Sequence, residues 1–175
     1  GTHKRNIELI NLQIKSSIDT SYGAAYFYYT DDILIDRCKF NDNFNVGDGS
    51  GVDIIFSSCN RCFVERCYSL TSDNLVSTTN SNVIGVVYNH IEDCLTCGIE
   101  FGSGAGCFAI GNTIITSGGV GIRLNACDNS LVMGNYIEGY EDCGIAIGDV
   151  NGASSNIISN NHILNGNGTS YGIWV

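Results

Sequence analysis

Residues 84–91 read Ile-Gly-Val-Val-Tyr-Asn-His-Ile, a phrase with the pattern apolar, any, apolar, any, any, Asn, any, Ile. The frame recurs along the chain, with Leu or Cys in place of Asn in the first copies. The residue in the Asn position of successive copies is Leu12, Cys38, Cys67, Asn89, Asn112, Asn135 and Asn161. The steps between copies are 26, 29, 22, 23, 23 and 26 residues, and periods of this length are typical of solenoids.

Two further columns of residues share this period. One opens a Gly-apolar-x-apolar phrase, and its members are Gly23, Gly51, Asn74, Gly98, Gly121, Gly144 and Gly172. The other is a column of small residues that precedes the first phrase, with the members Thr30, Cys59, Ser81, Gly104, Cys127 and Ala153. Three columns with one period indicate that each copy repeats the same structural unit.

The spacing of the apolar residues selects the architecture. They alternate at period two, which predicts strands rather than helices. Each strand is too short to bury its apolar face alone, but stacking the copies about 4.8 Å apart pairs each strand with its equivalent one repeat away. We therefore predict an all-β, single-stranded, right-handed parallel β-helix of about seven coils, each with 22–29 residues and three short strands.

The Asn position has a specific use in this architecture. Inward-facing side chains at a turn can hydrogen-bond the backbone and the identical side chains above and below. We expect such a ladder from Asn89, Asn112, Asn135 and Asn161. The alternative fold is a leucine-rich repeat, whose period overlaps. That fold requires L-x-x-L-x-L spacing, and the Gly-apolar-x-apolar phrase and the lack of helical periodicity count against it.

Composition narrows the classes of function. The 175 residues carry a net charge of −10, which repels a phosphate backbone and argues against nucleic-acid binding. The chain has no window of about twenty apolar residues, so we expect no membrane insertion. We expect one β-helix domain over residues 1–175, as a fragment of a longer chain, because both ends lie within strand phrases and lack a polar cap.

The nine cysteines suggest chemistry at first sight. Cys59 and Cys62, like Cys94 and Cys97, have the C-x-x-C spacing of zinc or redox sites. However, most of the cysteines stand where other copies carry Ser, Ala, Ile or Asn. We therefore predict small, buried, reduced thiols, with metal or redox use as the alternative, and we assign no metal ligand and no cofactor.

With the Asn column and the Gly-Ile-x-Ile phrase in view, the chain resembles the pectate-lyase-like β-helix superfamily from Asn6 to Val175. Within it, the chain looks most like bacteriophage tailspikes and related polysaccharide depolymerases. The resemblance implies binding of a bacterial surface polysaccharide, a homotrimer, and a place in the virion tail after folding in the host cytoplasm. A secreted or cell-surface location is the alternative. Asp31-Asp32 resembles the paired aspartates of polygalacturonases, but the other blocks of that family are missing.

The same alternation predicts which residues face outward. In the Gly-apolar-x-apolar strand, the predicted outward column is Ala25, Asp53, Val76, Glu100, Arg123, Ala146 and Trp174. In the superfamily that the chain resembles, this sheet and its flanking turns commonly line the carbohydrate site. Asp53 and Glu100 would lie two coils, or roughly 9.6 Å, apart. Carboxyl separations of roughly 6.5–9.5 Å suit an inverting glycosidase, so we predict this pair as the catalytic acid and base.

Three further residues complete the predicted site. Arg123 would bind a sugar acid or keep Glu100 ionised, and Trp174 would stack on a sugar ring. Asp48 lies in the long, oxygen-rich segment 41–50, which is expected to overhang the same sheet. The alternative interpretation is a solvated sheet face, on which acids beside an arginine contribute little.

A second outward column predicts assembly. It lies between the two apolar residues of the first phrase and includes Leu34, Phe63, Phe108, Leu131 and Ile157. Met133 stands two residues later in the frame and faces the same way. Monomers rarely expose a continuous apolar stripe of this kind. We expect it to pack against sister chains around a threefold axis, or else against a chain segment outside this sequence.

These predictions favour a tailspike-type β-helix that binds a bacterial polysaccharide and hydrolyses it with a carboxylate pair. A polysaccharide lyase is the enzymatic alternative, and it would need a base and an arginine or metal to neutralise a uronate. A non-catalytic shaft or glycan-binding adhesin segment is the alternative from another class of function.

Overall fold

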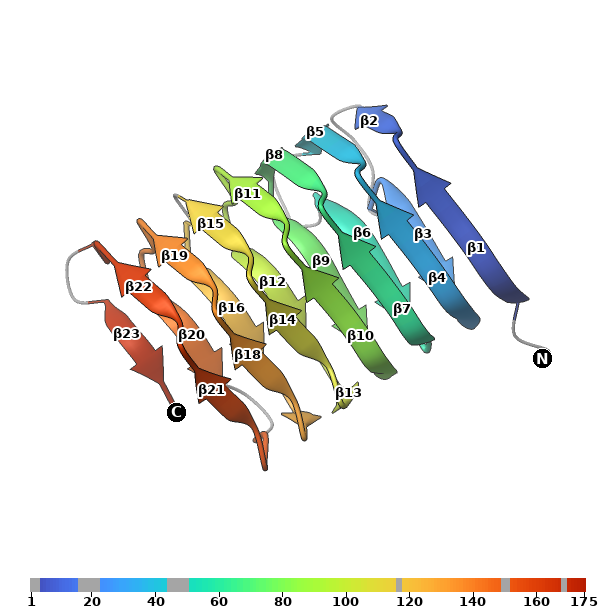
Figure 1. Ribbon diagram of the computed structural model, residues 1–175. Helices are drawn as coiled ribbons and strands as arrows, with labels where there is room; N and C mark the ends of the chain where they lie inside the picture. Colours follow the sequence, from blue (N-terminus) through green and yellow to red (C-terminus); the bar gives the residue numbers. More distant parts are fainter. Residues whose placement is uncertain (1–3, 16–22, 44–50, 116–117, 149–151, 168–169) are drawn as a thin grey trace.

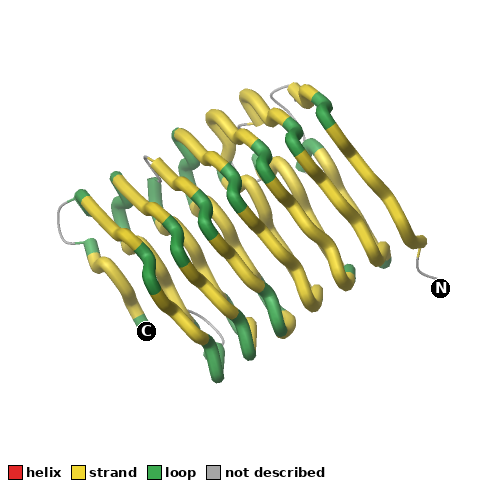
Figure 2. Tube along the Cα trace, viewed as in Figure 1, coloured by secondary structure: helices red, strands yellow, loops and turns green. Residues whose placement is uncertain are grey.

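The computed structural model describes residues 4–15, 23–43, 51–115, 118–148, 152–167 and 170–175, and here the chain winds as a parallel β-helix. Every regular element within these residues is a strand, as Figures 1 and 2 show. The leucine-rich-repeat alternative is therefore wrong, and the predicted β-helix is confirmed. The described residues form no helix that could cross a membrane.

The strands form three parallel sheets, each of which the chain visits once per coil. Sheet A follows the order β1 (Lys4–Ile10), β4 (Thr30–Asp36), β7 (Asn60–Glu65), β10 (Ser81–Val87), β14 (Phe108–Ile110), β18 (Leu131–Met133) and β21 (Ile157–Ser159), with the short β13 (Gly104–Ala105) and β17 (Cys127–Asp128) beside this path. Sheet B consists of β2 (Gln13–Lys15), β5 (Lys39–Asn43), β8 (Tyr68–Ser72), β11 (His90–Glu92), β15 (Thr113–Ile115), β19 (Tyr136–Glu138) and β22 (His162–Leu164). Sheet C consists of β3 (Ala25–Tyr28), β6 (Val52–Ser57), β9 (Asn74–Thr79), β12 (Cys97–Phe101), β16 (Val120–Leu124), β20 (Cys143–Ile147) and β23 (Tyr171–Trp174).

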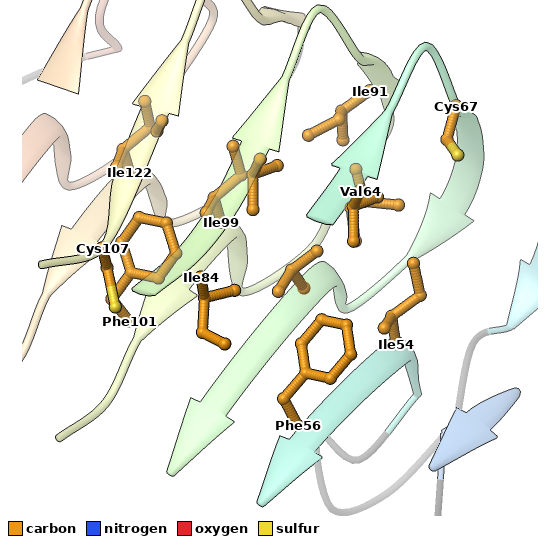
Figure 3. Packing of buried hydrophobic residues seen from close by; sticks show 14 of the residues in the cluster. Ile54, Phe56, Val64, Cys67, Ile84, Ile91, Ile99, Phe101, Cys107 and Ile122 are labelled. Atoms are coloured by element: carbon orange, nitrogen blue, oxygen red, sulfur yellow. The ribbon is translucent and has the colours of Figure 1, made fainter. Parts of the chain in front are cut away.

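The three sheets enclose one apolar interior. Figure 3 shows its side chains from several neighbouring coils, among them Ile54 of sheet C, Val64 of sheet A and Ile91 of sheet B. These three side chains are fully buried. Each buried apolar side chain contributes about 1.5–3 kcal/mol relative to leaving it in water, so the interior is the main source of stability.

The four ladder asparagines lie at the corner between sheets A and B. Asn112 Oδ1 accepts hydrogen bonds from the backbone N–H of Asn89 at 2.9 Å and from Asn89 Nδ2 at 3.0 Å. Asn89 Nδ2 also donates to the carbonyl of Val64, one coil below, at 2.9 Å. The same three contacts recur from Asn112 to Asn135 and from Asn135 to Asn161. The ladder therefore satisfies polar groups at a corner where no strand pairing exists.

A left-handed residue before each rung turns the chain at this corner. Tyr88, Gly111, Gly134 and Asn160 have φ values of 56°, 64°, 66° and 55°. In the earlier coils Arg37 and Arg66 adopt the same conformation before Cys38 and Cys67. The positive φ aims the next side chain inward, so that Asn or Cys becomes part of the interior.

All nine cysteines are free and buried, in agreement with the predicted thiols. Cys67 continues the ladder, because its N–H donates to Asn89 Oδ1 at 2.8 Å and its Sγ accepts from the N–H of Cys38 at 3.4 Å. Burial raises the pKa of the Cys67 thiol to about 12. The described residues contain no group of three or more His, Cys, Asp or Glu side chains placed to hold a metal. The cysteines with C-x-x-C spacing are among these buried residues.

We predict that Asn112→Ala lowers the free energy of unfolding by about 3 kcal/mol, because it removes the buried acceptor of the Asn89 backbone N–H and of one Asn89 side-chain N–H, and the donor to the carbonyl of Val86. The matched control is Asn82→Ala, which removes a similar rung at an exposed position, where water can replace it at a cost of about 1 kcal/mol or less. Urea denaturation of both variants measures the difference. Equal losses of unfolding free energy in the two variants would show that the buried ladder stabilises the fold no more than an exposed hydrogen bond does.

Candidate functional site

The outer face of sheet C carries a straight column of side chains. Strand register places Tyr26, Ile55, Ser77, Glu100, Arg123, Ala146 and Trp174 in this column. The last four members agree with the predicted column. The prediction is wrong for the first three coils, where Ala25, Asp53 and Val76 face the interior.

Asp53 is therefore not a partner of Glu100 on the outer face. Its side chain is fully buried, and Ser69 Oγ donates a hydrogen bond to its carboxylate inside the coil. Strand register puts Asp53 in the column of Gly98 rather than in that of Glu100. The predicted catalytic pair of Asp53 and Glu100 thus does not share a surface.

The physical reason lies in how the corner between sheets B and C is filled. A Cβ atom on Gly98 would lie 2.7 Å from the carbonyl oxygen of Gly121 and 2.9 Å from Cγ2 of Ile114, so this position needs glycine. In the coil of Asp53, the residue in the column of Ile114 is Ser69. The small, polar serine leaves room for the aspartate and hydrogen-bonds it. The sequence prediction aligns Gly51 with Gly98 because both are glycines, and it therefore assigns the wrong register to this strand.

Glu100 and Arg123 lie side by side on adjacent coils. Arg123 Nη1 is 3.7 Å from Glu100 Oε1, and Asn74 Nδ2 donates to Glu100 Oε2 at 3.3 Å. Both charged side chains are about one-fifth exposed, at 21% and 23%. A partly exposed pair of this kind contributes little to stability, so its main consequence is to fix two opposite charges on the outer face of sheet C.

A depression of about 290 Å³, here called the first depression, begins at Arg123 and extends over the last coils. Its floor is formed by Val120, Cys143 and Ala146, which with Cys97 make a small apolar cluster outside the main core. Its walls are Arg123, Glu141, Asp142, Ser170, Tyr171 and Trp174. Tyr171 and Trp174 are 62% and 41% exposed, so their ring faces are accessible.

A second depression of about 280 Å³ lies on the other side of the ion pair. It is lined by Ser77, Thr78, Thr79, Glu100, Gly102, Ser103, Asn125 and Ala126. Four residues with hydroxyl groups and the side-chain amide of Asn125 line this surface, and Asn125 Oδ1 is buried without a hydrogen-bond partner. A ligand with several hydroxyl groups would find both donors and acceptors here.

Some site residues follow from the sequence and others do not. Glu100, Arg123 and Trp174 are on the predicted face, and Asp48 lies outside the described residues. The sequence prediction misses Glu141, Asp142 and Tyr171 in the first depression. Glu141 and Asp142 belong to the turn before β20, and turns vary in length between coils, so the repeat carries no signal for them. Tyr171 directly precedes Gly172 of the Gly-apolar-x-apolar phrase, and this position could have indicated that it lies near the outer face of sheet C.

The predicted apolar columns on sheet A share one register. Leu34, Phe63, Gly85, Phe108, Leu131 and Ile157 form one column, and Met133 belongs to the column beside it. The rings of Phe63 and Phe108 lie 6.0 Å apart over Gly85, where a Cβ atom would come within 2.8 Å of both. These side chains thus cover one another in part, whereas Ile157 is 62% exposed.

Comparison with known proteins supplies the family. A family model described as a right handed beta helix region matches residues 22–175. The chain belongs to this right-handed β-helix family. A comparison with curated proteins gives no match. Family membership accounts for the fold, and proteins with this fold commonly act on carbohydrates. The function of this chain has to be inferred from the residues of the site.

We predict that Asp53 and Glu100 respond differently to substitution. Asp53→Ala should lower the free energy of unfolding by about 2 kcal/mol or more, because it removes the buried partner of Ser69. Glu100→Ala should change it by about 0.5 kcal/mol or less, because its ion pair is partly exposed. Urea denaturation compares the two directly, and an Asp53→Ala variant as stable as the parent would contradict the structural role of Asp53.

Proposed function

We propose that the chain binds a bacterial surface polysaccharide along the outer face of sheet C. The observation that carries this proposal is the first depression, which combines an apolar floor, two accessible aromatic rings and charged walls. Sugar rings have apolar C–H faces and hydroxyl edges, so they match aromatic rings flanked by polar groups. A hollow that combines apolar surface with polar groups is a common form of ligand site.

The arrangement of the two depressions favours a polymer over a free sugar. They lie on either side of the Glu100–Arg123 pair, along one face of one sheet. A glycan chain that runs parallel to the helix axis would contact both in succession. Arg123 offers a local positive charge for a sugar acid on an otherwise acidic protein.

Cleavage of the bound polysaccharide is the second candidate function. It is favoured by Glu100, a carboxylate that lines the second depression beside an arginine and an amide. Hydrolysis needs a second carboxylate. Because Asp53 is inside, Glu141 and Asp142 are the carboxylates that line the first depression with Arg123. A lyase would use Arg123 to neutralise a uronate.

The same proposal gives the chain the role of a phage tailspike segment that is displayed on the virion as a homotrimer. Its support is the outer face of sheet A, with Leu34, Phe63, Phe108, Leu131, Met133 and Ile157 in adjacent columns. Packing against sister chains would cover this face. Sheet C is a separate face of the solenoid, so a trimer formed through sheet A leaves the depressions accessible.

The test is a panel of purified bacterial capsules and lipopolysaccharides, examined by calorimetry for binding and by reducing-end and unsaturated-uronate assays for cleavage. We expect at least one polysaccharide to bind, and Trp174→Ala and Arg123→Gln each to weaken it about tenfold. Tyr88→Ala is the matched control, because Tyr88 is 63% exposed but precedes the Asn89 rung between sheets A and B. Cleavage that is lost in Glu100→Gln would favour the enzyme. Binding that is unaffected by Trp174→Ala and Arg123→Gln would contradict the proposed site.

A further inference from the structure

Three exposed tyrosines cluster in the first coil, outside both depressions. Tyr26, Tyr28 and Tyr29 are 45%, 56% and 50% exposed. Their rings contact one another: Tyr26 and Tyr28 are stacked at 6.4 Å, and Tyr28 and Tyr29 meet edge to face at 4.3 Å. The three rings thus form one surface, here called the tyrosine platform.

Strand register puts the tyrosine platform on the face that carries the depressions. Tyr26 shares the outward column of Glu100, Arg123 and Trp174. Tyr28 aligns with Ser57, which aligns with Thr79 in the wall of the second depression. Figure 1 shows β3 and β23 at opposite ends of sheet C.

The distances along this face follow from the spacing of the coils. Tyr26 is three coils from Glu100 and six from Trp174, which corresponds to roughly 14 Å and roughly 29 Å at the strand spacing of parallel sheets. The outward side chains between the tyrosine platform and the second depression are Ile55 and Ser57, and the depression begins at Ser77 and Thr79 in the next coil. None of them is charged, so a neutral stretch of chain could lie over them without burying a charge.

The chemistry of the tyrosine platform resembles that of the other end of the sheet. A hydrogen bond with Tyr29 raises the pKa of Tyr28 above its usual value, so the hydroxyl is neutral at physiological pH. Neutral phenol rings offer apolar faces for stacking and hydroxyl groups for hydrogen bonds, as Tyr171 does in the first depression, where Trp174 offers the face and the N–H of its indole ring. Both ends of sheet C therefore present rings suited to the two faces of a sugar.

We propose that Tyr26, Tyr28 and Tyr29 form a remote subsite for the same polysaccharide, and that the ligand is an extended chain that spans sheet C from β3 to β23. This inference rests on the proposed function. It adds that the protein recognises a long internal stretch of polymer rather than a short oligosaccharide or a chain end. Short fragments can occupy only one depression, whereas long fragments reach the tyrosine platform as well.

The experiment uses the polysaccharide that binds tightest in the panel, hydrolysed and separated by size. One probe is a short fragment of two or three sugar units, and the other is longer than sheet C. Trp174 is the single tryptophan of the chain and lines the first depression, so its fluorescence reports binding of both probes there. The variants are Tyr26→Ala/Tyr28→Ala, the milder Tyr28→Ser, and Tyr26→Phe/Tyr28→Phe, with Tyr88→Ala as the matched control.

We expect the double alanine variant to raise the Kd of the long fragment about tenfold or more and that of the short fragment less than about twofold. Tyr28→Ser should also raise the Kd of the long fragment more than that of the short fragment, but by a smaller factor. This milder variant keeps the test decisive if the double variant unfolds. The phenylalanine pair and Tyr88→Ala should retain tight binding of the long fragment.

An unchanged Kd for the long fragment in the tyrosine variants would overturn the inference and leave the proposed function intact. Loss of self-association in those variants, with glycan binding unaffected, would overturn it too and would assign the tyrosine platform to a second copy of the chain. Failure of every polysaccharide in the panel to bind would instead overturn the proposed function, and the inference with it.

Discussion

Hydrogen bonding between equivalent residues of successive coils is the constraint on which the rest of this structure depends. Each strand pairs in parallel with its copy one coil away, and at the corner between sheets A and B the Asn ladder takes over where strand pairing stops. A residue must therefore fit the equivalent residues above and below it as well as its own coil. The same constraint aligns the outward side chains in straight columns, in which successive side chains lie about 4.8 Å apart.

The parts of the fold that this stacking dictates could be predicted from the sequence. The Asn position is recognisable because a buried corner needs a side chain that both donates and accepts. Leu12, Cys38 and Cys67 stand there in the first three coils, and Cys67 Sγ accepts the hydrogen bond from the N–H of Cys38. The apolar columns of sheet A follow from the same frame. The register of sheet C could not be predicted in the first three coils, because the Gly98 position tolerates Asp53 when Ser69 lies opposite. The same error in register hid the outward position of Tyr26. The turn residues Glu141 and Asp142 were missed because turns do not follow the repeat.

Correcting that register changes the functional interpretation. A catalytic pair spaced by two coils is replaced by an ion pair between neighbours, Glu100 and Arg123, with an aromatic and acidic hollow on one side and a hydroxyl-rich hollow on the other. We therefore propose glycan binding as the first function of this face and cleavage as the second. Asp53 is a buried structural residue rather than a catalytic one, whereas Trp174 and Arg123 remain the residues that we propose for binding. Family membership explains the fold, and the proposed function rests on the side chains of one face.

The most direct test of this account is a crystal structure of the chain with a long fragment of the bound polysaccharide. The account predicts that the glycan lies along sheet C parallel to the helix axis, with a sugar ring against Trp174 and others over β16 and β12. Glycan bound on the outer face of sheet A or sheet B, or across the axis at a single coil, would contradict it.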